Sequence, residues 1–147
     1  MEWHKDDYSI TTDSSKANIP YIHNFISASY WGAGIPIEVV QKSVNGSLCF
    51  CVFYKEQQIG FARIITDKAT FGYLADVFID EQFRGRGLSK WLMEVITAHP
   101  DLQGFRRMLL ATRDAHGLYR KFGFTELPNP ERWMQIHNPD VYKKSGS

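Results

Sequence analysis

Two glycines and two arginines lie close together in the middle of the chain, in the segment Gln82-Phe83-Arg84-Gly85-Arg86-Gly87. An apolar run, Leu74 to Ile79, precedes the segment, and in residues 88–96 apolar side chains recur at the three- and four-residue spacing of one helical face. The first amides of a helix have no partner within the helix, and glycine lets the backbone approach a bulky ligand. The pattern therefore predicts a strand, an anion-binding loop and a helix, with a phosphate or pyrophosphate as the ligand.

Two familiar phosphate motifs do not fit this segment. A Walker loop needs Gly-Lys-Ser/Thr after its spacer, and a dinucleotide fingerprint needs a third glycine where this chain has Lys90. Gln82 to Gly87 instead matches Q/R-x-x-G-x-G/A, and here the chain resembles the GNAT superfamily of acetyl-CoA-dependent N-acetyltransferases. In that family the loop cradles the pyrophosphate of coenzyme A. The alternative for this segment is a glycine-rich turn that caps an ordinary helix.

A second segment, Leu109 to Phe124, strengthens the resemblance. It resembles the later strand and helix of the family, which typically end in alanine, then Leu-Tyr, then Gly-Phe. Those positions are here Ala115, Leu118, Tyr119, Gly123 and Phe124.

The resemblance implies a set of cofactor contacts. The backbone of the strand before the loop, often bulged in this family, would pair with the pantetheine arm, and the loop and helix start would hold the pyrophosphate. The residues expected to bind acetyl-CoA are Val77, Phe78, Ile79, Arg84, Gly85, Arg86, Gly87, Leu88, Ser89 and Tyr119. One contact is in doubt, because Thr112 stands where the family often has asparagine.

Tyr119 occupies the position where the family commonly places a tyrosine that protonates the departing thiolate. A phenol with a pKa of about 10 is protonated at pH 7 and can donate to a thiolate whose thiol has a pKa of about 8.5. The alternative is a core tyrosine with local hydrogen bonds.

Asp76 is the second catalytic candidate. It lies between Ala75 and Val77 in the strand that leads to the loop, where an unpaired carboxylate is costly to bury. It could assist deprotonation of the attacking amine, or it could pair with an arginine such as Arg63 on the neighbouring strand. His116 could carry a proton, although a solvent-facing histidine is the simpler interpretation.

The acceptor side is expected at large aromatic residues. In the resembled family the connection between the first two helices and the final strands wall the acceptor, which here means Tyr30, Trp31 and Trp133. Aromatic walls with few charges suit a small amine or an amino-acid side chain, although the tryptophans could equally be core residues.

The elements that must position these residues form an α/β arrangement of the mixed α+β kind. We expect strands at 8–12, 48–54, 59–66, 70–79, 106–112 and 133–137, and helices from Asn18 to near Trp31, at 36–43, at 88–96 and at 114–122 with Gly123 as a left-handed cap. The helix between 70–79 and 106–112 implies that these two strands are parallel neighbours. The expected fold is a GNAT-like central mixed sheet with a splayed parallel pair and helices on both faces.

Length and composition limit the other possibilities. The 147 residues suit one domain, residues 1–142, with a flexible tail at 143–147. A net charge of +1 gives no field to attract nucleic acid, and no apolar run approaches the roughly 20 residues of a membrane span. The amino-terminal residues do not form a secretory signal, so a cytoplasmic protein is expected, as a monomer or homodimer.

The cysteine and histidine content predicts neither a disulfide nor a metal site. Cys49 and Cys51 lie two apart in an expected strand, which suits packed thiols better than a bridge. The other candidate ligands lack the HxH or HExxH spacing.

Two main functions from different classes remain. The first is N-acetyl transfer from acetyl-CoA to a primary amine of a small molecule or peptide, favoured by the presence of both Asp76 and Tyr119. The second is a non-catalytic sensor or scaffold that binds an acyl-CoA. A nucleotide-binding protein that uses the same loop is a third possibility.

Overall fold

One sheet contains all the strands in residues 1–143, the part of the chain that the computed structural model describes. The strands are β1 (Glu2–Lys5), β2 (Tyr8–Thr11), β3 (Leu48–Tyr54), β4 (Gln57–Thr66), β5 (Phe71–Ile79) and β6 (Arg107–Leu110). The α-helices are α1 (Ile19–Ser27), α2 (Ile37–Asn45), α3 (Leu88–Ala98) and α4 (His116–Arg120). Most of the predicted tail, residues 144–147, lies outside the described residues.

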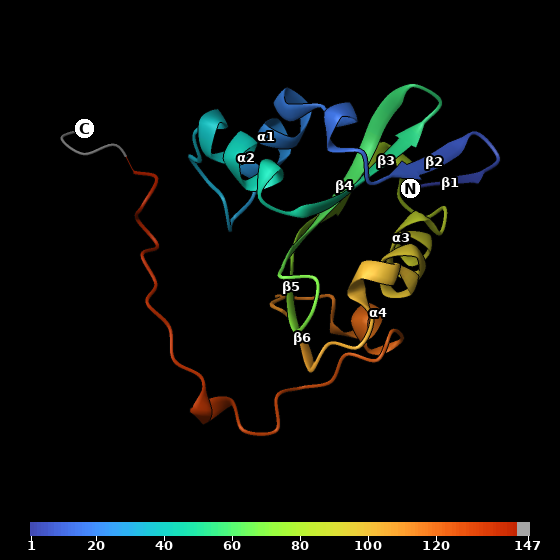
Figure 1. The fold of residues 1–147 in the computed structure, drawn as a ribbon. Coiled ribbons are helices and arrows are strands. Elements are labelled where there is room, and N and C mark those ends of the chain that lie inside the picture. The colour runs from blue at the N-terminus through green and yellow to red at the C-terminus, as the bar shows by residue number, and fades with distance from the viewer. Residues whose placement is uncertain (144–147) are drawn as a thin grey trace.

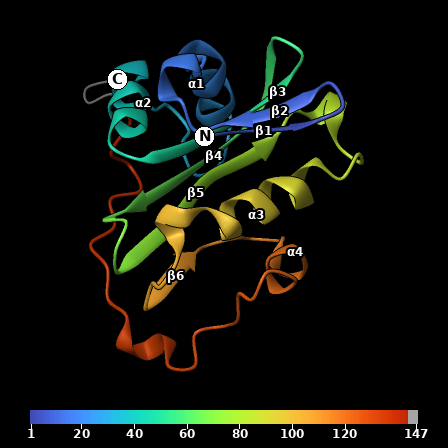
Figure 2. The same cartoon turned by 45° about the vertical axis from the view of Figure 1, so that its right-hand side comes forward.

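The strands follow one another across the sheet in chain order, β1 to β6. Each pair from β1 to β5 is antiparallel, whereas β5 and β6 are parallel and are connected through α3. Figures 1 and 2 show α1 and α2 on one face of the sheet and α3 and α4 on the other. The predicted mixed sheet with a parallel pair and helices on both faces is confirmed.

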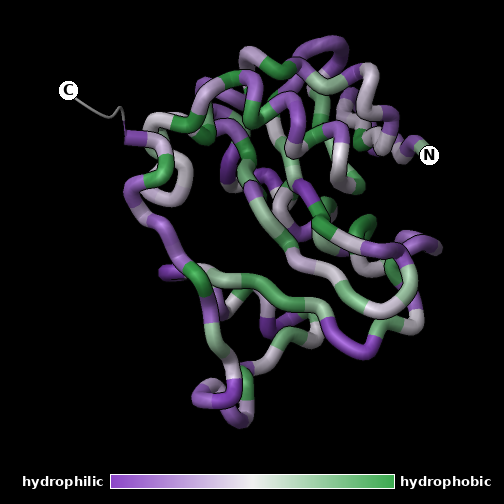
Figure 3. The backbone as a smooth tube through the Cα atoms, turned by 60° about the vertical axis from the view of Figure 1, so that its left-hand side comes forward, coloured by the Kyte–Doolittle hydropathy of each residue, from purple (hydrophilic) through white to green (hydrophobic). Residues whose placement is uncertain are grey.

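A separate hydrophobic cluster lies on each face of the sheet. The cluster under α3 contains the fully buried Leu92, Met93 and Ile96, together with residues of the central strands. The cluster under α1 and α2 is built around Ile22, Val40 and other buried residues. Burial of such side chains stabilises the fold by about 1.5–3 kcal/mol each. In Figure 3 hydrophobic residues recur along the interior strands, as this two-sided burial requires.

Local sequence explains where α1 begins and why it ends earlier than predicted. The Asn18 side chain accepts a hydrogen bond from the Tyr21 amide, and Pro20 occupies the first turn. The helix was expected to continue to near Trp31, but it ends at Ser27. The amide and the hydroxyl of Ser29 both donate to the Ile26 carbonyl, which closes the last turn and releases Tyr30 and Trp31 into a connecting loop.

Strand pairing between β5 and β6 stops well before β5 ends. Phe71 to Leu74 pair with Arg107 to Leu110, but no β6 partner exists for residues 75–79 within the described part of the chain. The two strands therefore diverge beyond Leu74, as the predicted splay requires, and one edge of the β5 backbone is left without a ladder.

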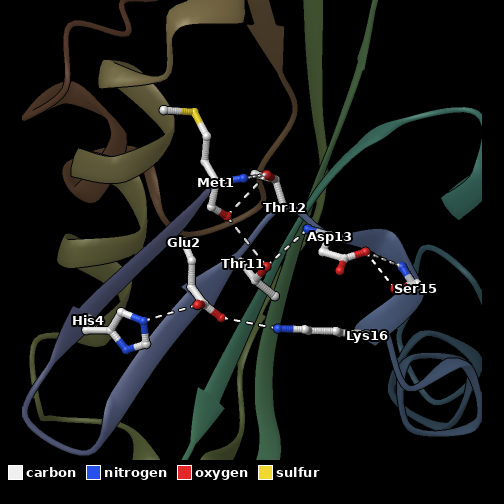
Figure 4. A network of polar contacts seen from close by, with 8 residues as sticks. All are labelled: Met1, Glu2, His4, Thr11, Thr12, Asp13, Ser15 and Lys16. Atoms are coloured by element: carbon white, nitrogen blue, oxygen red, sulfur yellow. Dashed lines mark hydrogen bonds and ion pairs between the residues drawn. The ribbon is translucent and has the colours of Figure 1, made fainter.

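The amino-terminal hairpin adds a strand that the sequence analysis missed. β1 has only four residues, and three of them are exposed, so no alternation identifies it. The amino-terminal ammonium donates to Thr12 Oγ1 at 3.0 Å, and Glu2 pairs with Lys16 at 3.4 Å (Figure 4). These contacts hold β1 at the sheet edge.

The predicted closing strand at 133–137 is wrong. This segment pairs with no strand in residues 1–143, and two of its apolar residues are almost fully exposed, Met134 at 95% and Ile136 at 104%. The chain then runs along one side of the molecule until Tyr142 lies beside Gly34 (Figure 1). Alternation of apolar residues predicts a strand only where a neighbouring strand and a face to bury them exist.

None of the helices in residues 1–143 combines the length and apolarity that a bilayer crossing requires. Both cysteines are free and buried on the face under α1 and α2.

Burial raises the pKa of both Cys49 and Cys51 from 9.0 to about 12. We expect both thiols to resist iodoacetamide at pH 8 in the folded protein and to react after unfolding in urea, because the thiolate is the nucleophile. Since the folded pKa exceeds the unfolded one, the thiols also reduce the free energy of unfolding as pH rises from about 9 towards about 12. A Cys49→Ala/Cys51→Ala variant should show a smaller loss of urea stability between pH 8 and 10. Rapid alkylation of the native protein would contradict this burial.

Candidate active site at the splayed strands

The loop after β5 has the backbone geometry of an anion cradle. A short 3-10 turn, Glu81–Phe83, leads to Gly85 and Gly87, which have φ angles of +78° and +76°. A Cβ built at either glycine would meet nothing within 4 Å. The left-handed backbone therefore favours glycine at both positions, and the space beside them is open rather than packed against protein.

Free amides line this loop and the start of α3. The amides of Gln82, Phe83 and Arg84 donate to Asp80 or Glu81. By contrast, the amides of residues 85–90 find no acceptor within the described residues, and the first bonded amide of the helix is that of Trp91, which donates to the Gly87 carbonyl. Consecutive unpaired N–H groups at a helix start are a binding site for a phosphate or other anion.

The two arginine side chains of the loop are partly engaged in holding it. Arg84 Nε donates to the Ile79 carbonyl at 3.2 Å. Arg86 Nη1 donates to the Tyr8 hydroxyl at 2.8 Å, and its guanidinium lies over the Phe83 ring. Each guanidinium keeps further donors, but its first contribution is to fix the loop against β5 and β2.

A β-bulge lies in β5 directly before the loop, as the resemblance implied. Phe61 pairs with Phe78 and Arg63 pairs with Ala75, so Asp76 and Val77 together face a single residue of β4. Asp76 has a left-handed φ of +53°, a conformation that aspartate tolerates better than most non-glycine residues.

This bulge reverses the side-chain alternation of β5. Leu74 belongs to the cluster under α3, and regular alternation would place Asp76 on the same face. Instead Val77 and Ile79 pack into that cluster, and Phe78 packs against Phe25 under α1 with ring centroids 3.7 Å apart. The extra residue thus carries the Asp76 side chain towards α1 and α2.

Asp76 is held by contacts to both of its carboxylate oxygens. Arg63 Nε donates to Oδ2 at 2.8 Å, and the Trp31 indole Nε1 donates to Oδ1 at 2.8 Å. Arg63 also donates to the Ser47 hydroxyl at 3.1 Å. The Asp76 and Arg63 side chains are only 8% and 15% exposed. The ion pair that the sequence analysis left open is therefore present, and Arg63 neutralises the buried charge of Asp76.

Tyr119 lies on the face of the sheet that also carries α3 and the loop before it. It is a buried member of the α3 cluster and packs edge-on against Phe124. Burial raises the pKa of its hydroxyl above 10, which keeps the group protonated at neutral pH. The hydroxyl makes no hydrogen bond within the described residues. No fully buried polar side-chain atom lacks a partner there, so the hydroxyl oxygen must be at least slightly accessible. Tyr119 also lines a cavity of about 890 Å³ between β6 and α4.

The residues expected on the acceptor side are only partly brought together. Tyr30 and Trp31 contact each other edge to face at 5.1 Å and lie beside the bulge through the Trp31–Asp76 hydrogen bond. Trp133 instead lies under the Arg107 guanidinium at the first residue of β6. Because Arg107 pairs with Phe71, about five residues or roughly 16 Å before Asp76 along β5, Trp133 lies near the other end of the strand pair.

Two polar residues at this site were not singled out from the sequence. Ser47 orients Arg63, and Arg113 stacks on the Tyr30 ring with 3.6 Å between its guanidinium carbon and the ring centroid. Neither has a motif of its own, and only the fold brings them near Asp76. Thr112, which stands where the family often has asparagine, accepts from the Ala115 amide and so caps the turn into α4. His116 is exposed at the first residue of α4, as the simpler interpretation held.

Within residues 1–143, no group of three or more histidine, cysteine, aspartate or glutamate side chains is placed to hold a metal ion. The groups at the bulge are hydrogen-bond donors, an ion pair and aromatic rings.

The comparison with known families agrees with this geometry. Residues 45–126, which include β3 to β6, the phosphate loop and α4, match the family model for the acetyltransferase (GNAT) domain. The chain belongs to the GNAT acetyltransferase family. A crystal structure of a protein from Xanthomonas campestris pv. campestris, assigned as an acetyltransferase of the same family, superposes on this GNAT domain with a TM-score of 0.91. It is 46% identical and covers 93% of this chain and 97% of that one.

More distant similarities are found in sequence and in structure. A Gibberella zeae protein assigned as an acetyltransferase is 28% identical over 82% of this chain and 80% of its own length. A GNAT acetyltransferase from Elizabethkingia anophelis, crystallised with acetyl-CoA bound, has a TM-score of 0.61 and 17% identity, and covers 82% of this GNAT chain and 78% of its own. At this level of identity, the similarity shows a shared fold alone.

Replacement of Gly87 by valine should abolish or strongly weaken acetyl-CoA binding. A side chain at φ +76° is strained, and its atoms would occupy the open space beside the free amides. Gly104→Val is the matched control, because Gly104 has the same φ of +76° and the same open surroundings but lies before β6, outside the loop.

Isothermal titration with acetyl-CoA and thermal unfolding would be measured on both variants. Both are expected to lose some stability from backbone strain, but only Gly87→Val is expected to lose binding. Equal affinity in the two variants would remove the loop from the cofactor site.

Proposed function

We propose that this protein transfers an acetyl group from acetyl-CoA to a primary amine of a small molecule or peptide. One observation carries the proposal: the unpaired edge of β5 beyond Leu74 leads directly into the free amides of residues 85–90. An extended thioester arm could pair with the first and a pyrophosphate could bind the second. A plain glycine-rich turn would account for neither the splay nor the bulge.

In this proposal the cofactor lies across the splayed strands. The backbone of Val77, Phe78 and Ile79 pairs with the pantetheine arm, and the amides from Arg84 to Ser89 bind the pyrophosphate. The bulge at Asp76 and Val77 frees backbone donors near the thioester carbonyl. Such donors stabilise the negative oxygen that develops when the carbonyl is attacked.

The reaction exchanges a C–S bond for a C–N bond. The neutral amine attacks the thioester carbonyl carbon, and the tetrahedral adduct loses its excess proton from nitrogen and expels the sulfur. The sulfur leaves as the thiol of coenzyme A after it accepts a proton. Tyr119, protonated at neutral pH and open to solvent at its hydroxyl, is the proposed donor of that proton.

Loss of the amine proton is the step for which Asp76 was predicted as a base. Deprotonation at pH 7 costs about 4.6 kcal/mol for an amine with a pKa of about 10.4, whereas it costs about 1 kcal/mol for an α-amino group. Both Asp76 oxygens already accept hydrogen bonds from Arg63 and Trp31. We therefore favour Asp76 as a residue that positions the bulge and Trp31, with the proton released to water, over Asp76 as the base itself.

The rival function is a sensor or scaffold that binds an acyl-CoA without turnover. The discriminating experiment is free-thiol release from acetyl-CoA in the presence of a mixed panel of amines, combined with calorimetric binding of acetyl-CoA. Amine-dependent thiol release supports the transferase. Tight binding with no turnover on any acceptor would support the sensor, and stronger thermal stabilisation by ATP or NAD than by coenzyme A would indicate a nucleotide-binding protein.

Tyr119→Phe should lower turnover by about ten- to a thousandfold while the dissociation constant of acetyl-CoA stays unchanged. The phenol proton is needed only as the thiolate leaves, and phenylalanine preserves the packing against Phe124. Steady-state rates and calorimetry on the variant check this. An unchanged kcat would remove Tyr119 from the mechanism.

Two single variants, Asp76→Asn and Arg63→Met, test the role of the ion pair. Asparagine tolerates the left-handed backbone at position 76, so the first variant removes mainly the charge. It should reduce the free energy of unfolding by about 1–3 kcal/mol, less than the roughly 3–5 typical of a fully buried pair, because Arg63 keeps some contact with solvent.

If Asp76 positions the bulge, both variants lose turnover to a similar extent at every pH. If Asp76 is the base, Arg63→Met keeps its activity, whereas Asp76→Asn needs more alkaline conditions. The pH profiles of kcat for the two variants therefore decide between the roles.

A further inference from the structure

A continuous chain of contacts crosses the gap between the splayed strands on the face of α1 and α2. It starts at Asp76 on β5, passes through the hydrogen bond to Trp31 and the edge-to-face contact to Tyr30, and ends at Arg113 in the turn after β6. Its four members come from three segments that are far apart in the sequence. The loop between α1 and α2 thus connects the bulge of β5 to the segment that follows β6.

The two charges at the ends of this chain are in different states. The carboxylate of Asp76 is neutralised by Arg63 at 2.8 Å. Arg113 forms no ion pair and donates no hydrogen bond to any of residues 1–143, although the carboxylate of Asp114 is next to it in the sequence. Arg113 therefore places a positive charge without an ion-pair partner in residues 1–143 beside Tyr30.

The orientation of Arg113 is set by Tyr30. With its carbon 3.6 Å from the ring centroid, the guanidinium stacks on the Tyr30 ring through one face. A stacked guanidinium keeps its N–H donors in the plane of the group, free at the edge. Such a preorganised fork matches the two oxygens of a carboxylate.

The surface beside this fork is apolar and accessible. Tyr30 is 61% exposed and Trp31 is 45% exposed, although both are large aromatic residues. An acceptor that suits the surface has a short or apolar body to lie against the rings and an anionic group to reach Arg113.

We propose that Arg113, held in place by Tyr30, binds the carboxylate of the acceptor, so that the substrate class is amines that carry a carboxylate, such as free amino acids. This inference rests on the proposed function for the acetyl transfer itself, but the recognition can be measured by binding alone. Arg113 is a substrate-binding residue in this account, and Tyr30 positions it.

The experiment compares free proteinogenic amino acids with their carboxamides as matched pairs, beginning with L-phenylalanine and L-phenylalaninamide. Each is titrated by calorimetry into protein saturated with coenzyme A, and kcat/KM is measured with acetyl-CoA wherever thiol is released. At least one amino acid should bind the wild-type protein about tenfold or more tightly than its amide. The preference should fall towards one in Arg113→Ala and to an intermediate value in Arg113→Lys, which keeps the charge but not the fork.

Three controls give the test its specificity. Arg106→Ala removes an exposed arginine just before β6, away from the bulge, and should keep the full preference. Tyr30→Phe should keep it, because a phenyl ring still supports the guanidinium, and Tyr30→Ala should lose most of it. The dissociation constant of acetyl-CoA should not change in Arg113→Ala.

Several outcomes would overturn the proposal. One is the absence of any pair in which the carboxylate form binds more tightly, and another is a preference that survives in Arg113→Ala. Weaker acetyl-CoA binding in Arg113→Ala would indicate that the guanidinium binds acetyl-CoA and not the acceptor. A preference that depends on Arg113 without any thiol release would uphold the recognition site and reject the proposed transfer.

Discussion

The left-handed conformation of Asp76 is the constraint on which the site depends. A non-glycine residue at φ +53° costs about 1–2 kcal/mol relative to an extended residue, so other contacts must hold it there. The Arg63 guanidinium and the Trp31 indole supply them, one at each carboxylate oxygen. Without these partners, the carboxylate of Asp76 would be buried without a counter-charge, and the side chain would turn out to solvent.

Several features of the fold follow from that one residue. The extra residue reverses the alternation of β5, so Val77 and Ile79 contribute to the core under α3 while Phe78 packs under α1. It also lies where β5 has left β6 and has no ladder on that edge. Backbone groups that a regular sheet would use are thereby available to a ligand, close to a loop whose own amides are unpaired. The opening in the sheet and the anion cradle are thus adjacent on a short stretch of chain.

The proposed acceptor side depends on contacts of a different kind. The early end of α1 releases Tyr30 and Trp31 into the loop before α2, where they reach β5 on one side and Arg113 on the other. Aromatic contacts and one indole hydrogen bond therefore connect the splayed strands on this face. Tyr30 and Arg113 are exposed and make no contact with the bulge themselves, so the fold does not depend on their identity.

The sequence by itself determined what depends on neighbours along the chain. The loop from Gln82 to Gly87, the helix after it, the Asn18 cap, and strands such as β3 at Leu48–Tyr54 follow from local patterns, since turns, caps and alternation are set within a few residues. The helix between the strands at 70–79 and 106–112 implied the parallel pair, and the family resemblance added the bulge and the role expected of Tyr119.

Only the tertiary structure decided which partner each long-range contact takes. The sequence left Asp76 as either a base or a partner of Arg63, and β4 was needed to bring the two within 2.8 Å. The segment at 133–137 was expected to form the closing strand, yet it pairs with no strand in residues 1–143, so that prediction was wrong. Arg113 has no motif and becomes part of the site because the turn after β6 meets the loop after α1. Local patterns cannot specify such contacts, because they form between segments whose distance in space is fixed by the packing of the whole sheet.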